Sequence, residues 1–201
     1  MGVQGVSEPQ IVLMKIIYAT QTGNSEELAE QLGKSLNITP VSIADIDLDD
    51  LQNETCMFIL STWGEGEPPD DGERFLDEIA SSDKDLSAMS YSICGLGDDS
   101  YEIFCGFAKE TDKYLSQLGA NRFSENVYCN VDYEDEFQSW SSNVISTLVN
   151  KNPTNRSDSD KEKISLLIDD LKIINNRVKE WEWKWPNIQI EALIRALHRK
   201  Q

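Results

Sequence analysis

Hydroxyl and amide side chains gather in one short segment, Thr20-Gln21-Thr22-Gly23-Asn24-Ser25. The segment follows an apolar run and precedes a helical pattern, so its backbone N–H groups begin a helix. Free N–H groups and the helix dipole attract anions there, and the side chains add donors. Neither G-x-x-x-x-G-K-[ST] nor G-x-G-x-x-G is present, so neither an ATP-type loop nor a dinucleotide fingerprint is indicated. We expect a phosphate site without a lysine, and the alternative is a simple capped turn.

Two further segments each place an aromatic residue near glycines. Residues 61–70, STWGEGEPPD, hold Trp63 beside Gly64 and Gly66, and residues 94–104, CGLGDDSYEIF, hold Tyr101. An aromatic ring can lie flat on a planar ligand, and glycines let the backbone approach the ligand's edge. Either aromatic alone is more simply a core or surface residue. The three segments together indicate a planar ring with a phosphate tail.

Each of the three segments follows a predicted strand, because apolar runs occupy residues 11–20, 56–62 and 90–97. Further strands are predicted at 41–46 and 126–131, and helices at 25–36, 72–81, 104–118 and 134–149, the last with Asp132 as its N-cap. Alternating strands and helices predict βαβ units and a parallel sheet. Ligands of such sheets bind beyond the carboxyl ends of the strands, where the three segments would meet.

Three stretches of the sequence, TQTGNSEELA, STWGEGEPPDDGERFLDEI and GLGDDSYEIFCGFAKETDKYLSQLGA, resemble the flavodoxin family. They are most similar to the FMN-binding domain of diflavin reductases of the sulfite reductase flavoprotein type, over residues 15–149. The resemblance implies an α/β, flavodoxin-like, three-layer fold with a doubly wound five-stranded parallel sheet in the order 2-1-3-4-5 and one non-covalent FMN.

The resemblance also assigns residues to FMN. It places Thr20, Gln21, Thr22, Gly23, Asn24 and Ser25 at the phosphate; Thr62, Trp63, Gly64, Glu65 and Gly66 along one side of the ring; Leu96, Gly97, Asp98, Tyr101, Phe104 and Cys105 along the other; and Asp132 near the flavin.

Two features depart from the diflavin pattern. Trp63 stands where that pattern has Tyr or a polar residue, and nothing in residues 151–201 resembles an FAD- or NADPH-binding half. The resemblance therefore implies an electron carrier without catalytic residues of its own. It would take electrons from a separate NADPH-dependent flavin reductase and pass them singly to a haem or iron–sulfur acceptor protein. The alternative is a flavodoxin-like interaction or regulatory module that acts through its C-terminal helices.

The composition narrows the classes of partner. The chain has 36 acidic and 18 basic residues, a net charge of −18, which disfavours nucleic acid and anionic membrane surfaces. No apolar run approaches the ~18 residues of a membrane span. The 4 cysteines form no C-x-x-C pair and the only histidine is His198, so we expect reduced thiols, no metal site and a cytoplasmic protein.

The charge is unevenly distributed along the chain, which indicates a boundary between two segments of different character. Residues 1–150 hold 7 basic and 28 acidic side chains, whereas residues 151–201 hold 11 and 8. We predict a domain at 1–150, a polar linker at 151–160 and two helices at 161–201. Apolar residues recur every three or four positions from Ile164 to Trp185, as on a heptad seam. This tail would either pack as a helical hairpin or mediate dimerisation or partner docking.

Overall fold

The computed structural model describes residues 13–151, and the expectations for the linker and the helical tail lie outside these residues. In chain order the elements are β1 (Met14–Ala19), α1 (Asn24–Leu36), β2 (Val41–Ser42), the 3-10 turns η1 (Ile43–Asp45) and η2 (Leu48–Leu51), β3 (Thr55–Ser61), α2 (Glu73–Ser81), β4 (Ser90–Leu96), α3 (Gly106–Gln117), β5 (Asn121–Arg122), β6 (Val127–Cys129) and α4 (Glu134–Lys151). All strand pairs are parallel.

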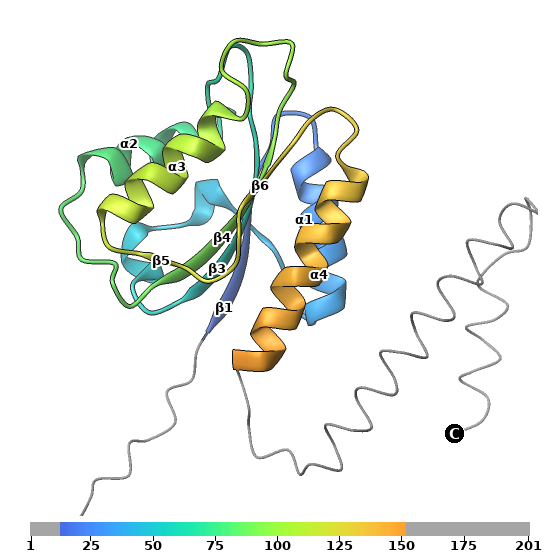
Figure 1. Cartoon of the computed structure of the whole chain (residues 1–201). Coiled ribbons are helices and arrows are strands. Elements are labelled where there is room, and N and C mark those ends of the chain that lie inside the picture. Colours follow the sequence, from blue (N-terminus) through green and yellow to red (C-terminus); the bar gives the residue numbers. More distant parts are fainter. Residues whose placement is uncertain (1–12, 152–201) are drawn as a thin grey trace, which may run out of the picture. The chain divides into compact units, whose positions relative to one another are not determined.

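The sheet has the strand order β2-β1-β3-β4-β5, with β6 also paired to β4. This order confirms the predicted 2-1-3-4-5 topology. Helices α1 and α4 cover one face of the sheet, and α2 and α3 cover the other (Figure 1). The sheet is therefore the middle of three layers, and its apolar side chains are buried on both faces, as the continuous apolar runs predicted.

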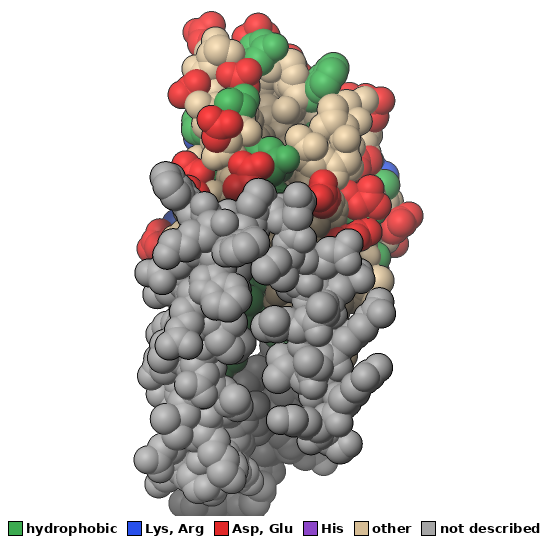
Figure 2. Space-filling model, turned by 90° about the vertical axis from the view of Figure 1, so that its right-hand side faces the viewer, with side chains coloured by type: hydrophobic (Ala, Val, Ile, Leu, Met, Phe, Trp, Pro, Cys, Tyr) green, Lys and Arg blue, Asp and Glu red, His purple; other side chains and the backbone are tan. Residues whose placement is uncertain are grey.

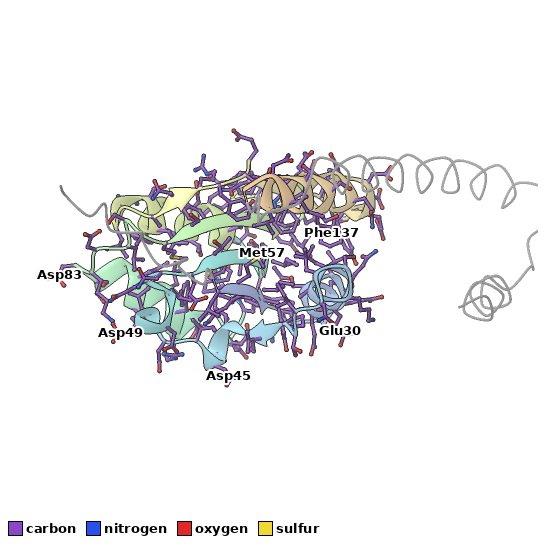
Figure 3. The ribbon with its side chains drawn as sticks, turned by 90° about the horizontal axis from the view of Figure 1, so that it is seen from below. Glu30, Asp45, Asp49, Met57, Asp83 and Phe137 are labelled. Carbon is purple, nitrogen blue, oxygen red and sulfur yellow. The ribbon has the colours of Figure 1, made fainter. Side chains whose placement is uncertain are left out.

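The side chains of β3 alternate between two separate cores. Met57 packs with Phe137 in the cluster under α1 and α4, whereas Phe58 packs with Phe75 in the cluster under α2 and α3. Figure 3 shows Met57 and Phe137 inside the domain, while the labelled acidic side chains, such as Glu30, lie at its periphery. A rigid two-sided core thus supports the loops at the carboxyl ends of the strands.

The strand predicted at 126–131 is shortened to β6, and a second short strand, β5, precedes it; both pair with β4. Between β5 and β6, the side chain of Asn126 replaces the backbone hydrogen bonding to β4. Its Oδ1 accepts a hydrogen bond from the Ile93 backbone N–H at 2.9 Å. Its Nδ2 donates to Asp112 on α3 at 2.8 Å. The buried backbone donor of β4 is satisfied without a continuous fifth strand.

Three predicted boundaries are wrong for local reasons. The second strand ends at Ser42, whose hydroxyl accepts from the Ala44 backbone N–H at 3.3 Å and so begins η1. Helix α3 starts at Gly106 because Cys105 has a left-handed backbone with a φ of 52°. Asp132 does not cap α4, since the first helical bond runs from the Phe137 N–H to the carbonyl of Tyr133.

Candidate functional site

The three loops singled out in the sequence meet at the carboxyl edge of the sheet, at the top of Figure 1. They are the 20s loop (residues 20–25), the 60s loop (residues 61–70) and the 100s loop (residues 97–105). A cleft of about 430 Å³ opens between them and the segment after β6. Its lining residues are Gln21, Thr22, Asn24, Ser61, Thr62, Trp63, Gly64, Leu96, Gly97, Asp98, Tyr101, Ile103, Cys105, Val131 and Tyr133. The volume is in the range of small-molecule sites.

The structure brings most of the predicted site residues to this cleft. Those that line it are Gln21, Thr22, Asn24, Thr62, Trp63, Gly64, Leu96, Gly97, Asp98, Tyr101 and Cys105. Those that do not are Thr20, Gly23, Ser25, Glu65, Gly66, Phe104 and Asp132. The second group divides by position: some members shape the loops from behind, as described below, whereas Glu65 and Asp132 are exposed.

The 20s loop presents the start of α1 to the cleft. Gly23 precedes the helix with a φ of 96°, and its N–H donates to Thr20 Oγ1 at 2.9 Å. The first helical hydrogen bond runs from the Glu27 N–H to the Gly23 carbonyl at 3.0 Å. The N–H groups of residues 24–26 precede that bond and have no partner within the helix. With the dipole of a 13-residue helix behind them, they form a site for an anion.

A hydroxyl pair connects the 20s loop to the next strand. Ser25 Oγ lies 2.6 Å from Ser61 Oγ, so one hydroxyl donates to the other. Ser25 is buried behind the cleft, whereas Ser61 lines it at the end of β3. The anion-binding turn is therefore held in register with the start of the 60s loop.

The 60s loop is a tight turn with Trp63 at its base. The Trp63 N–H donates to the Glu67 carbonyl at 2.8 Å, and the Glu67 N–H donates back to the Trp63 carbonyl at 2.9 Å. Gly64 and Gly66 lie between them with φ values of 53° and 135°. These two positive φ values make the turn dependent on glycine. The turn holds the indole of Trp63 out at the cleft, with 55% of the residue exposed.

The 100s loop begins with a turn around Asp98. Its Oδ1 accepts from the Ser100 N–H at 2.8 Å, and its carbonyl accepts from the Tyr101 N–H at 3.3 Å. The hydrogen bonds from Ser100 lower the pKa of the Asp98 carboxyl, so it is a carboxylate at neutral pH. The turn carries Tyr101 to the wall of the cleft, which Trp63 of the 60s loop also lines.

Most of the exposed large hydrophobic residues of the described chain converge on this one site. Six such residues occur in residues 13–151, and four of them, Trp63, Tyr101, Ile103 and Val131, line the cleft. Apolar surface concentrated in this way marks a binding site rather than scattered surface residues. The arrangement favours a flat apolar ligand between the loops.

One buried hydroxyl in the wall has no partner. Thr62 Oγ1 is inaccessible to solvent and makes no hydrogen bond, although the Thr62 N–H donates to the Leu96 carbonyl at 2.8 Å. A buried unpaired hydroxyl is costly unless a ligand completes it. Because Thr62 lines the cleft, a ligand with a polar group beside this residue would complete the hydroxyl's hydrogen bonding.

Four lining residues were not predicted from the sequence: Ser61, Ile103, Val131 and Tyr133. Val131 and Tyr133 lie just beyond β6. The rule that ligands bind beyond the carboxyl ends of parallel strands applies to this strand as well. Applied to the fifth predicted strand, it would have indicated both residues. Ile103 has no such signal, since only folding of the 100s loop brings it to the cleft.

The electrostatic character of the site is acidic. Among the residues that line the cleft, Asp98 is the only Asp or Glu, and no Lys or Arg is present. Among the charged side chains visible on the face shown in Figure 2, Asp and Glu predominate over Lys and Arg. Within residues 13–151 no group of three or more His, Cys, Asp or Glu residues could hold a metal ion. The anion site thus depends on N–H groups and hydroxyls rather than on a cation.

A second hollow of about 480 Å³ lies at the other edge of the domain, between the loop at residues 82–85 and the end of α3. It contains no residue of the three loops, and helices end there, so their carbonyls face it. It does not suit a phosphate.

None of the helices in the described part of the chain has the length and apolar character needed to cross a membrane.

Comparisons with known proteins agree with this geometry. The family model for Flavodoxin matches residues 16–140. The chain is 36% identical over 140 residues to the "Sulfite reductase (NADPH) flavoprotein alpha-component" of Bacillus subtilis (strain 168), covering 66% of the chain and 23% of that protein. It is 41% identical over 135 residues to the protein of the same name from Vibrio vulnificus (strain CMCP6), covering 63% of the chain and 22% of that protein. The chain thus spans less than a quarter of the length of these relatives.

Solved structures show the same fold. A short-chain flavodoxin associated with a non-canonical PDU bacterial microcompartment has a TM-score of 0.58 and 28% identity, covering 68% of the chain and 99% of that structure. The flavodoxin of Streptococcus pneumonia TIGR4 also has a TM-score of 0.58, with 24% identity, covering 67% of the chain and 99% of that structure.

Proposed function

Because the chain belongs to the flavodoxin family, whose members bind FMN, we propose that it is an FMN-dependent electron carrier that transfers electrons one at a time. The observation that supports this most strongly is the cleft itself. An anion site at the start of α1 and two aromatic-bearing loops meet there, with exposed apolar side chains between them. FMN, when bound, supplies an isoalloxazine ring that accepts and releases single electrons.

We propose that the residues at the cleft divide the work of holding FMN. The N–H groups at the start of α1, with the side chains of Thr22 and Asn24, hold the phosphate. Trp63 and Tyr101 cover the ring and exclude water from it. The unpaired hydroxyl of Thr62 completes its hydrogen bonding on the cofactor. Because no basic side chain lines the cleft and Asp98 is ionised, added negative charge at the ring is disfavoured, which gives a strongly reducing carrier.

The two curated relatives are named as flavoprotein components of an NADPH-dependent sulfite reductase. We propose that this chain likewise works between other redox proteins. Its electrons come from an NADPH-dependent flavin reductase, and they pass to a haem or iron–sulfur acceptor protein. The four buried cysteines are free thiols, which suits a reducing compartment such as the cytoplasm.

Cofactor binding is tested with FMN and riboflavin, which differ only in the phosphate. We expect FMN to quench the protein's tryptophan fluorescence and riboflavin to bind at least about 100-fold more weakly, since it cannot use the N–H groups of α1. Trp63→Ala is expected to weaken both ligands. Equal affinity for FMN and riboflavin would contradict the assignment of the phosphate site, and failure to bind either would favour the alternative of an interaction module.

Electron transfer is tested on the FMN-loaded protein. Anaerobic reductive titration is expected to show two resolved one-electron steps. With NADPH and a purified NADPH-dependent flavin reductase, the protein should then increase the rate of cytochrome c reduction, and salt should lower that rate because the surface is acidic. A single two-electron step with no transfer to cytochrome c would refute the carrier function.

A further inference from the structure

Lys109 lies in the first turn of α3, directly behind the 100s loop. Its Nζ donates a hydrogen bond to the carbonyl of Phe104 at 2.5 Å. The same ammonium group lies 5.1 Å from the centroid of the Phe104 ring and 5.4 Å from that of the Tyr128 ring on β6. Both distances are within the range of cation–π attraction. One cation therefore ties the end of the 100s loop to the strand next to it.

The segment that Lys109 holds forms part of the cleft wall. Cys105 follows Phe104 with a φ of 52°, a left-handed conformation that a non-glycine residue keeps only when its surroundings hold it. Cys105 lines the cleft, and the Phe104 ring packs on Gly97, 3.2 Å from where a Cβ on that glycine would lie. A shift of Phe104 would therefore displace two lining residues, Gly97 and Cys105.

The charge of Lys109 is not used in an ion pair. Residues 13–151 hold 27 acidic side chains, yet none of the ion pairs formed within this part of the chain includes Lys109. Its partners are instead a backbone carbonyl and two aromatic rings. Burial raises the pKa of the Cys105 thiol to about 12, and the Lys109 cation opposes that rise, so the ammonium acts on this residue as well.

We propose that Lys109 is a positioning residue for the cofactor: its ammonium group fixes the Phe104 carbonyl, keeps Cys105 in its left-handed conformation and so holds the 100s-loop wall of the cleft. The role in cofactor binding rests on the proposed function, but the clamp itself does not. Lys109 does not line the cleft, so it acts through Phe104 and Cys105. The clamp needs both a donor and a positive charge, which arginine can supply and methionine cannot.

The clamp is tested first without cofactor, by amide hydrogen exchange of the full chain. The N–H groups of Tyr101 and Gly106 both donate to carbonyls of the 100s loop, to Asp98 O at 3.3 Å and Ile103 O at 3.2 Å. In Lys109→Met we expect both amides to exchange about tenfold faster, while core amides of β3 are unchanged. The matched control is Lys113→Met, which removes the same charge from the same helix, where the ammonium lies 5.0 Å from the Tyr114 ring, outside the cleft.

FMN affinity is the second readout. We expect Lys109→Met to weaken FMN binding about tenfold, Lys109→Arg to restore it to within about twofold of the parent, and Lys113→Met to have no effect. Parental exchange and affinity in Lys109→Met would overturn the proposal, as would equal losses in Lys109→Arg and Lys109→Met. If the parent protein binds no FMN, the proposed function fails, and the exchange rates still decide whether the clamp exists.

Discussion

The packing between the 60s and 100s loops predicts a defined response to one added methyl group, in Gly106→Ala. Gly106 begins α3, and a Cβ built on it would lie 2.5 Å from the Gly66 carbonyl oxygen and 2.9 Å from Gly66 Cα. Both atoms belong to the backbone of the 60s loop, so no side chain can rotate away. The methyl group must push the two loops apart.

The size of the effect follows from these distances. Ordinary van der Waals contact begins at 3.4 Å, so the oxygen at 2.5 Å must move by roughly 0.9 Å. Forced overpacking of this kind costs about 1–3 kcal/mol. The protein without cofactor can relieve part of this strain by parting the loops, but FMN needs both walls at once. The loss in unfolding free energy and the loss in FMN binding free energy should therefore add up to about 1–3 kcal/mol. If all of this loss falls on binding, the FMN Kd rises by a factor of about 5 to 150.

Two measurements give the two parts: urea unfolding of the protein without cofactor, and the FMN Kd from fluorescence quenching. The control is Gly119→Ala. Gly119 has a φ of 90°, and the nearest atom to an added Cβ is 3.5 Å away at Ser87, so only backbone strain is introduced, at the far end of α3. This control should lower stability by about 1–2 kcal/mol and leave the FMN Kd unchanged. Parental stability and parental affinity in Gly106→Ala would refute the reasoning.

Three further substitutions test other features of the domain. Thr62→Val should weaken FMN binding about fivefold to tenfold without loss of unfolding free energy. The control Thr111→Val removes another buried unpaired hydroxyl, outside the cleft, and should leave the FMN Kd unchanged. Equal effects of the two substitutions on the FMN Kd would contradict the role of Thr62. Burial raises the pKa of the Asp71 carboxyl in the folded protein, so its stabilising contribution is complete below pH 3.8 and lost as the pH rises through the raised pKa. The unfolding free energy of the parent protein should therefore fall over this pH range relative to that of Asp71→Asn. Parallel curves of unfolding free energy against pH for the two proteins would contradict this. Asn126→Ala should cost about 2 kcal/mol in urea unfolding because it leaves the buried N–H of Ile93 unpaired, and a loss below about 0.5 kcal/mol would show that water replaces the amide.

The fold was predictable because its determinants are local and periodic. The continuous apolar runs of β3 and β4 identify strands buried on both faces, and the helical stripes between them force parallel connections. The short elements were less predictable. The second strand stops at Ser42 because one hydroxyl bond favours a 3-10 turn, and Asn126 replaces part of the fifth strand with a side-chain bond. Such side-chain bonds leave no trace in hydrophobic periodicity.

The candidate site shows the same division. Loop residues such as Thr22, Trp63 and Tyr101 were predictable because they follow strands whose carboxyl ends must share one edge. Ile103 was not predicted to line the cleft, nor was Phe104 predicted to pack behind it. Which loop side chains face the cleft depends on the backbone dihedral angles of the glycines and of Cys105. Contacts with other loops hold these angles.

The residue types and spacings of the sequence by themselves predicted alternating strands and helices, a parallel sheet, and three loops at one edge of it with the chemistry to bind a planar ring and a phosphate. The strand order and FMN followed from the resemblance to the flavodoxin family. Only the tertiary structure decided how the walls of the cleft are held. The Ser25–Ser61 hydroxyl pair, the contact of Gly106 with Gly66 and the cation of Lys109 behind Phe104 each join residues of different elements or loops. Contacts of this kind arise from close packing of the folded chain, and no local pattern encodes their distances.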